Sequence, residues 1–112
     1  MNECGQSTFT SESTEASPAL QDCQILQQIL GQTFVASFGW DVGPESMELT
    51  AYGTCAFTAR AVGKSGTVGN EDVFDLLRDS IATEARNKHL GVRGSMFCGG
   101  VEVEWKIQKK RD

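Results

Sequence analysis

The sequence predicts an α+β fold in which two helices pack on a mostly antiparallel sheet, a split β-α-β sandwich cross-linked by disulfide bonds. Three observations support this prediction. Two segments carry apolar residues at helical spacing, and several others alternate apolar and polar residues as half-buried strands do. Four cysteines are spread widely along the 112 residues. Layering both helices on one sheet is the natural way to bury their apolar stripes.

The first part of the chain predicts a strand, a loop and a helix. Residues 4–10 have the composition of a short strand, and the hydroxyl-rich segment 11–17 is too polar for a core. A Ser-Pro pair then marks a helix start, with the serine as N-cap and the proline at the first helical position. We therefore expect a helix over 18–30, with Cys23 on its apolar face.

The middle of the chain predicts strands. Segment 38–42 alternates as a strand edge or a packed loop does. Segment 47–60 alternates strictly, which predicts one long half-buried strand whose apolar face includes Leu49, Ala51 and Cys55.

The last part predicts a second helix and two strands. Asn70 is a good N-cap, and two acidic residues follow it in the first turn, so we expect a helix from 70 to about 87. Segments 95–98 and 101–107 predict strands, and in the second of these the odd-numbered residues face inward. The charged residues 108–112 are expected to be a frayed tail.

The four cysteines are Cys4, Cys23, Cys55 and Cys98, and the gaps between them are too wide for the close ligand pairs of a zinc site. Wide spacing is typical of disulfide bonds formed in an oxidising compartment, although a cytosolic protein with free thiols is an alternative. Three pairings are possible. We favour Cys23–Cys55, because a helix stripe must pack on a sheet face, and this leaves Cys4–Cys98 to tie the chain ends together.

Composition limits the classes of partner. The formal net charge is -5, and nucleic-acid binders are usually basic, so nucleic acid is an unexpected partner. No apolar run approaches the roughly 20 residues that span a bilayer. We expect one monomeric domain over 1–112, with its core over about 4–107, and no cofactor or metal. The start Met1-Asn2-Glu3 carries no signal peptide, which suggests a mature form whose leader an initiator Met replaces.

No catalytic motif is visible in the sequence. His89 is the single histidine, and an exposed position near a helix end is its expected role. Glu102 and Glu104 lie two residues apart on one strand face, about 7 Å by strand rise, which is within the spacing of an inverting glycosidase. Alternating glutamates on a strand are far more often a solvated face, so we predict that the protein is not an enzyme.

The candidate residues for surface recognition are Trp40, Lys109, Lys110 and Arg111. Trp40 forms an aromatic group with Phe34 and Phe38, for which core packing is the alternative. The three basic residues have the alternative of a solvated tail.

Short motifs follow one another along nearly the whole chain. They are Cys4-Gly5 with Ser7-Thr8-Phe9, Ala16-Ser17-Pro18, Asp22-Cys23, Gly39-Trp40, Tyr52-Gly53-Thr54-Cys55-Ala56-Phe57, Val68-Gly69-Asn70 with Asp72, then Gly91, Gly94, Met96 and Cys98, and Val103-Glu104-Trp105. In this order, and with all four cysteines, they resemble the fungal necrosis-inducing-factor family of extracellular effectors. The chain departs from that pattern at residues 106–112, which replace a short apolar ending.

The resemblance implies a secreted virulence factor of a plant-associated fungus, acting in the host apoplast. Such a factor provokes host cell death or a defence response by binding an unidentified plant protein or membrane component. The resemblance also implies likeness to fungal killer toxins, which are small α/β sandwiches, and in larger members the domain accompanies chitinases. The alternatives are a toxin against competing fungi and a secreted apoplastic enzyme or enzyme inhibitor. The family offers no established catalytic residues to carry over.

Overall fold

The computed structural model describes residues 3–32, 38–84 and 86–110. Its elements are β1 (Thr10–Ser11), α1 (Leu20–Gln32), β2 (Gly39–Val42), β3 (Met47–Tyr52), β4 (Cys55–Ala61), β5 (Gly66–Gly69), α2 (Asn70–Thr83), β6 (Val92–Cys98) and β7 (Val101–Lys109).

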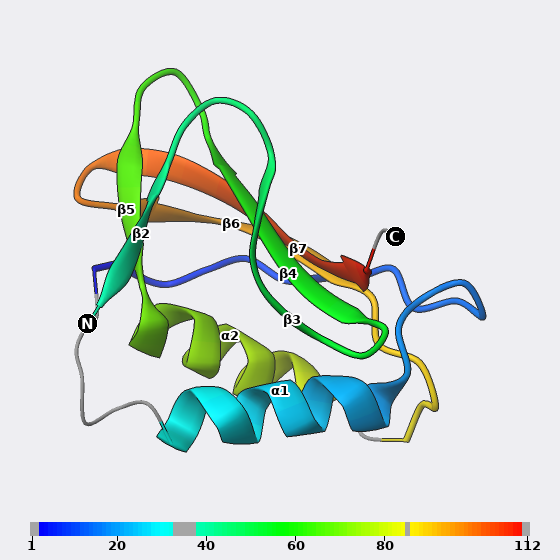
Figure 1. Cartoon of the computed structure of the whole chain (residues 1–112). Helices are drawn as coiled ribbons and strands as arrows, with labels where there is room; N and C mark the ends of the chain where they lie inside the picture. The colour runs from blue at the N-terminus through cyan, green and yellow to red at the C-terminus, as the bar shows by residue number, and fades with distance from the viewer. Residues whose placement is uncertain (1–2, 33–37, 85, 111–112) are drawn as a thin grey trace.

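Five strands form one antiparallel sheet in the order β1-β6-β7-β4-β3. Helices α1 and α2 lie side by side against one face of this sheet (Figure 1). Strands β2 and β5 pair separately as a two-stranded ribbon at one end of the molecule (Figure 1). The predicted α+β arrangement of two helices on a mostly antiparallel sheet is therefore confirmed.

The core lies between the helices and the sheet, and β7 shows how the sequence pattern builds it. The odd-numbered residues from Val101 to Ile107 are buried, as predicted, and the even-numbered ones lie on the opposite face. The ring of Trp105 stacks on Phe57 of β4 at a centroid distance of 5.6 Å. Its indole nitrogen donates a hydrogen bond of 2.7 Å to the hydroxyl of Ser7, which satisfies its polar end.

The structure contains the two disulfide bonds that the sequence analysis favours. Cys23 of α1 joins Cys55 of β4 and so fastens a helix to the sheet. Cys4 joins Cys98 at the end of β6. The second bond does not tie the two ends of the described chain together, because the C-terminal end of β7 lies at the far end of the molecule (Figure 1).

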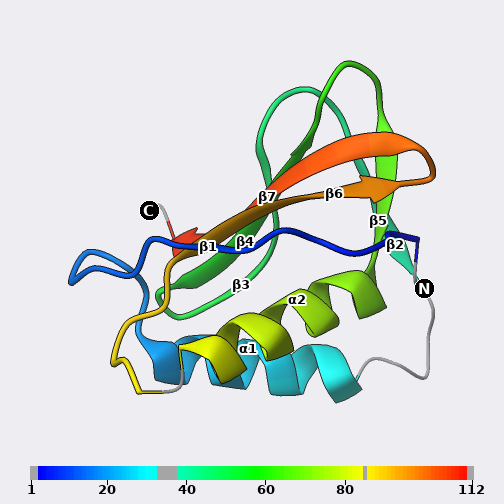
Figure 2. The ribbon, with the colours of Figure 1, turned by 180° about the vertical axis from the view of Figure 1, so that it is seen from behind.

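The expected strand over residues 4–10 is wrong for most of its length, because only Thr10 and Ser11 form a regular strand. The rest of this segment runs beside β6 in an irregular path (Figure 2). The hydroxyl oxygen of Thr8 accepts a hydrogen bond from the Ser95 amide. A side-chain hydrogen bond thus takes the place of one backbone hydrogen bond of a regular strand pair. Gly94 makes this close approach possible, since a Cβ there would collide with the Thr8 carbonyl and with the Trp105 ring.

Both helices are shifted from their predicted limits. Helix α1 starts two residues later than predicted, because the chain at its start pairs with the segment that precedes β6. The amide of Leu20 donates to the carbonyl oxygen of Lys88, and the amide of Leu90 donates to that of Pro18. Helix α2 ends at Thr83 rather than near residue 87, because the chain must turn to reach that pairing.

Asn70 is not the N-cap of α2 but its first helical residue. The N-cap is Gly69, whose amide donates to the buried carboxylate of Asp72 at 2.8 Å. The same carboxylate accepts the amides of Glu3 and Cys4, in the N-terminal segment of the chain, at 2.8 and 3.2 Å. A carboxylate in the first turn also suits the positive end of the helix dipole. Asp72 therefore anchors the N-terminal segment to α2.

The predicted long strand over residues 47–60 is a hairpin. Gly53 adopts a positive φ of 57°, which only glycine takes at little cost, and reverses the chain between β3 and β4. Cross-strand partners share a face, so Tyr52 lies on the face of Cys55 and Ala51 does not. A bulge between Glu48 and Thr50 accommodates Leu49, which is buried. The predicted inward position of Ala51 is therefore wrong, and that of Leu49 is right.

Three further strand limits differ from the prediction. No strand was predicted over β5, Gly66–Gly69, and β6 begins at Val92 instead of residue 95. Strand β7 continues past residue 107, because Gln108 and Lys109 pair with Ala56 and Cys55. Residues 108 and 109 therefore belong to β7 and not to the expected tail.

Candidate functional site

The face of the five-stranded sheet that points away from the helices is called the outer face here. Both views show α1 and α2 on the same side of the sheet (Figures 1 and 2). Because side chains alternate along each strand, the outer face of β7 carries Glu102, Glu104 and Lys106. The residues beside them in the ladder come from β4 and β6.

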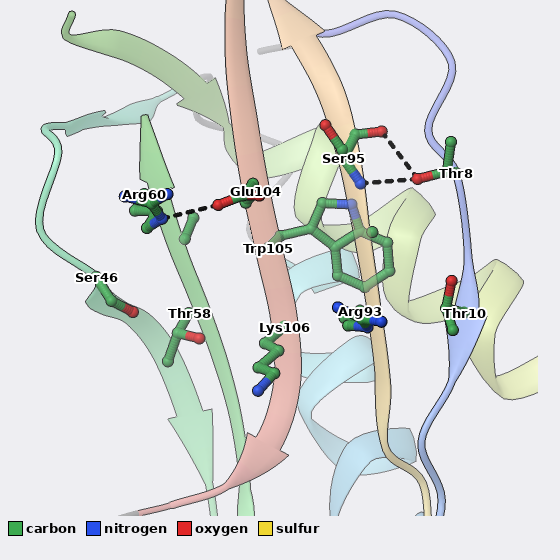
Figure 3. A pocket seen from close by; sticks show the side chains of 12 residues that line it. Thr8, Thr10, Ser46, Thr58, Arg60, Arg93, Ser95, Glu104, Trp105 and Lys106 are labelled. Carbon is green, nitrogen blue, oxygen red and sulfur yellow. Dashed lines mark hydrogen bonds and ion pairs between the residues drawn. The ribbon is translucent and has the colours of Figure 1, made fainter. Parts of the chain in front are cut away.

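A hollow of about 470 Å³ opens on this face, which we name the sheet groove (Figure 3). Its volume lies in the range of small-ligand sites, roughly 300–1,000 Å³. Hydroxyl groups and charged side chains dominate its lining, which consists of Thr8, Thr10, Ser46, Thr58, Ala59, Arg60, Arg93, Gly94, Ser95, Glu104, Trp105 and Lys106.

One row of the groove crosses four strands in register. Thr58 pairs with Lys106, Lys106 pairs with Arg93, and Arg93 pairs with Thr10. Two cations are thus direct cross-strand neighbours, an arrangement that destabilises a sheet. Arg93 has an exposed ion pair with Glu12 at 3.4 Å. Lys106 forms no ion pair with any residue in the described ranges.

The next row contains the acidic residues that the sequence compared with a glycosidase pair. Glu104 forms an ion pair of 2.8 Å with Arg60 on β4 (Figure 3). Glu102 accepts a hydrogen bond of 2.9 Å from the hydroxyl of Ser95. Each carboxylate thus has a neighbouring strand residue as its partner, which is the pattern expected of a solvated strand face.

The predicted recognition residues do not come together. Trp40 packs partly buried against the core, with its ring 5.2 Å from that of Phe38. Lys109 ends β7, and Lys110 pairs with Glu48 at 3.4 Å. Strand β2, which carries Trp40, and the C-terminal end of β7, which carries Lys109, lie at opposite ends of the molecule (Figure 1). Arg111 and the aromatic residue Phe34 lie outside the described residues.

His89 has a structural contact. It is half-buried, and its Nδ1 lies 3.0 Å from the carbonyl oxygen of Ser17, beside the bridge between Ala19 and His89. It is not part of the sheet groove. Among the described residues, no group of three His, Cys, Asp or Glu side chains could hold a metal ion.

A second hollow, of about 660 Å³, lies between α2 and the N-terminal segment. Its charges largely satisfy one another: Arg78 pairs with Asp75 at 3.3 Å and with Asp79 at 3.0 Å. Partial burial raises the pKa of Asp75, an effect that the nearby Arg78 opposes. The Asp72 carboxylate in this hollow is engaged with backbone amides. The sheet groove, whose Lys106 has no ion-pair partner among the residues that the structure describes, is the stronger candidate for a binding site.

Comparison with known proteins gives the family. The sequence model of the Hce2 family, described as pathogen effectors and proposed necrosis-inducing factors, matches residues 3–98. The chain belongs to this family. The resemblance noted in the sequence motifs is therefore confirmed, and all four cysteines lie within the matched residues.

Two curated relatives of the Hce2 domain come from Penicillium expansum. Probable chitinase LysM18 is 32% identical over 114 residues, and secreted chitinase LysM12 is 27% identical over 121 residues. Each match covers 94% of this chain but only 8% of the relative. A glycerol kinase of Borrelia hermsii is 32% identical over 104 residues, which is 92% of this chain and 20% of that enzyme. Because the chain spans so little of these proteins, their names describe them and not this domain.

Sequence reasoning placed Lys106 on the outer face of the Hce2 domain but did not find Arg60 and Arg93. A signal for Arg93 was present: the Gly99-Gly100 turn fixes the register of β6 against β7, and this register sets Arg93 opposite Lys106. The neighbour relation of β4 and β7 depends on contacts between distant segments, so no local signal reveals the position of Arg60. No helix within the described ranges is long and apolar enough to cross a membrane.

Proposed function

We propose that this protein is a secreted effector that provokes cell death or a defence response in a plant host, by binding a host target without catalysing a reaction. The observation that carries the proposal is the match of residues 3–98 to a family of pathogen effectors. Two disulfide bonds support secretion, because such bonds form and persist in oxidising compartments.

The sheet groove is the surface that we assign to target binding. Most of its residues belong to an antiparallel sheet, whose paired backbone fixes where these side chains begin without help from a ligand. Its hydroxyl groups have no histidine beside them to act as a base, since His89 is not part of the lining. The carboxylate of Glu104 is bound to Arg60. This chemistry supports binding better than hydrolysis.

A second candidate function is a toxin that acts on competing fungi. Two of the matched relatives carry the name chitinase, an enzyme class that acts on a fungal wall polymer, and this observation favours an antifungal role. The two functions differ in the organism that responds. They are therefore separable by the choice of target cell.

The experiment infiltrates plant leaves with native protein and, as the matched control, with protein that has been reduced and alkylated. We expect cell death or a defence response to the native protein only, with no sugar released from isolated plant or fungal walls. Sugar release by the native protein would refute the non-enzymatic assignment. Inhibition of fungal growth without any leaf response would favour the antifungal function instead.

A further inference from the structure

We propose that the sheet groove binds an acidic oligosaccharide, a short sugar chain carrying carboxylates, with Arg93 and Lys106 as its anion-binding pair. This inference rests on the proposed function, because it names the chemical class of the host partner. Trp40 and Lys110, which the sequence suggested as recognition residues, do not line the groove.

The charge arrangement is the first argument. The chain as a whole is acidic, yet two cations are adjacent on neighbouring strands, where like charges repel. An anion placed between Arg93 and Lys106 would remove that repulsion. The contact of Arg93 with Glu12 does not prevent this, because both side chains are highly exposed, at 60% and 42%, and exposed ion pairs are weak.

The hydroxyl groups are the second argument. Thr58 and Thr10 flank the two cations in their row, which continues beyond Thr58 to Glu48 on β3, and Ser46 adds a further hydroxyl to the lining. The hydroxyls of Thr8 and Ser95 also line the groove, with the Ser95 amide and Glu102 as their present partners. Hydroxyls both donate and accept, so they suit the hydroxyls of a sugar ring. The planar guanidinium of Arg93 suits a carboxylate, which it can bind through two parallel hydrogen bonds. A carboxylated sugar presents both groups on one small ring.

The surroundings of the groove argue against a lipid surface. Glu102 and Glu104 lie on the same face of β7, and Glu48 and Glu12 lie on neighbouring segments. A flat anionic bilayer would meet these carboxylates as well as the cations. A narrow oligosaccharide would contact only one of these carboxylates, that of Glu104, which lines the groove and is paired with Arg60. The favourable charge is therefore local, as a small ligand requires.

The test measures binding of trigalacturonic acid to the whole chain by isothermal titration calorimetry. The matched ligand is the fully methyl-esterified trisaccharide, which has the same rings without charge. The variants are R93Q and K106Q, and the matched control is K64Q, which removes one exposed positive charge outside the groove lining. We expect the free acid to bind, the ester to bind at least tenfold more weakly, and R93Q and K106Q each to weaken binding about tenfold. K64Q should bind as the unmodified protein does.

Unfolding in urea checks that the variants fold. The urea midpoints of R93Q and K106Q should not fall, because each change removes one member of a repelling pair. Equal binding of acid and ester, or equal losses in K64Q and K106Q, would overturn the inference. Binding of inorganic phosphate or of phosphatidylserine vesicles, with none of trigalacturonic acid, would also overturn it. If K106Q loses the leaf response while trigalacturonic acid does not bind, the inference fails and the proposed function stands.

Discussion

Replacing Cys23 and Cys55 together with alanine is expected to lower the free energy of unfolding by about 4 kcal/mol. The two residues are 32 positions apart, and closing a loop of that length in the unfolded chain is worth about 3.7 kcal/mol in the chain-entropy model. Both residues are fully buried, and we choose alanine because it leaves no unpaired polar group in the core. The Cys4–Cys98 bond partly confines the same segment, which makes the estimate an upper one.

The measurement is urea unfolding of the double variant C23A/C55A beside the unmodified protein, both without reductant. The variant C4A/C98A is the matched comparison, because its separation of 94 residues predicts about 4.7 kcal/mol. A domain of this size is usually stable by about 5–15 kcal/mol, so either loss is large. A loss below about 1 kcal/mol for C23A/C55A would refute the reasoning. A peptide linking Cys4 to Cys23 or Cys55 in a digest of unreduced protein would refute the pairing itself.

Three further predictions follow from individual contacts. Under denaturing, non-reducing conditions a thiol reagent should find no reactive thiol, whereas one or more per chain would contradict the two disulfide bonds. His89→Ala should keep the leaf response and lose about 1 kcal/mol of stability with its contact to Ser17; a folded variant without the response would place His89 in the binding surface. Hydrogen bonds from the backbone and hydroxyl of Thr54 lower the pKa of Asp22 below its ordinary value of 3.8, so its contribution to stability is present above that value and is lost as pH falls through the lower folded pKa. Asp22→Asn should therefore cost about 1 kcal/mol at pH 7 and nothing at the acid end, and a cost that did not depend on pH would contradict this account.

Much of the fold could be predicted because its signals are local. The alternation along β7 follows from the two-residue period of a strand, and the stripe of α2 follows from the helical period. The turn at Gly53 was missed because alternation continues in the sequence on both sides of it. Only the positive φ of Gly53 and the register of Tyr52 against Cys55 show that the chain reverses.

The ends of the helices could not be predicted because distant segments decide them. Ser17 and Pro18 resemble a helix start, yet the backbone of Pro18 is engaged with Leu90, far along the chain. At α2 the N-cap position belongs to Gly69 and not to Asn70, and the Gly69 amide binds the carboxylate of Asp72, which also binds the N-terminal segment. Local propensity gives way when a tertiary hydrogen bond satisfies the same backbone groups.

The candidate site could not be found from composition, because its cations are far apart in the sequence and the chain is acidic overall. Exposed residues on a strand are expected to be merely solvated, so Lys106 alone carries no information. It becomes informative when the sheet sets Arg93 beside it and leaves it without an ion pair in the described chain. The basic residues 109–111 were a candidate for recognition only because they are adjacent in the sequence.

The disulfide bonds involve no residue of the sheet groove, which we propose as the surface that binds the target. Cys55 faces the helix layer, where it joins Cys23, and Cys98 joins the N-terminal segment. No residue of the groove lining is a cysteine, and its ion pair between Arg60 and Glu104 is about half exposed, so it contributes little to stability. Side chains on the outer face can therefore change at small cost while the sheet keeps its shape. This arrangement suits a protein that must recognise a target through an open surface, and it is why groove variants are expected to lose binding without unfolding.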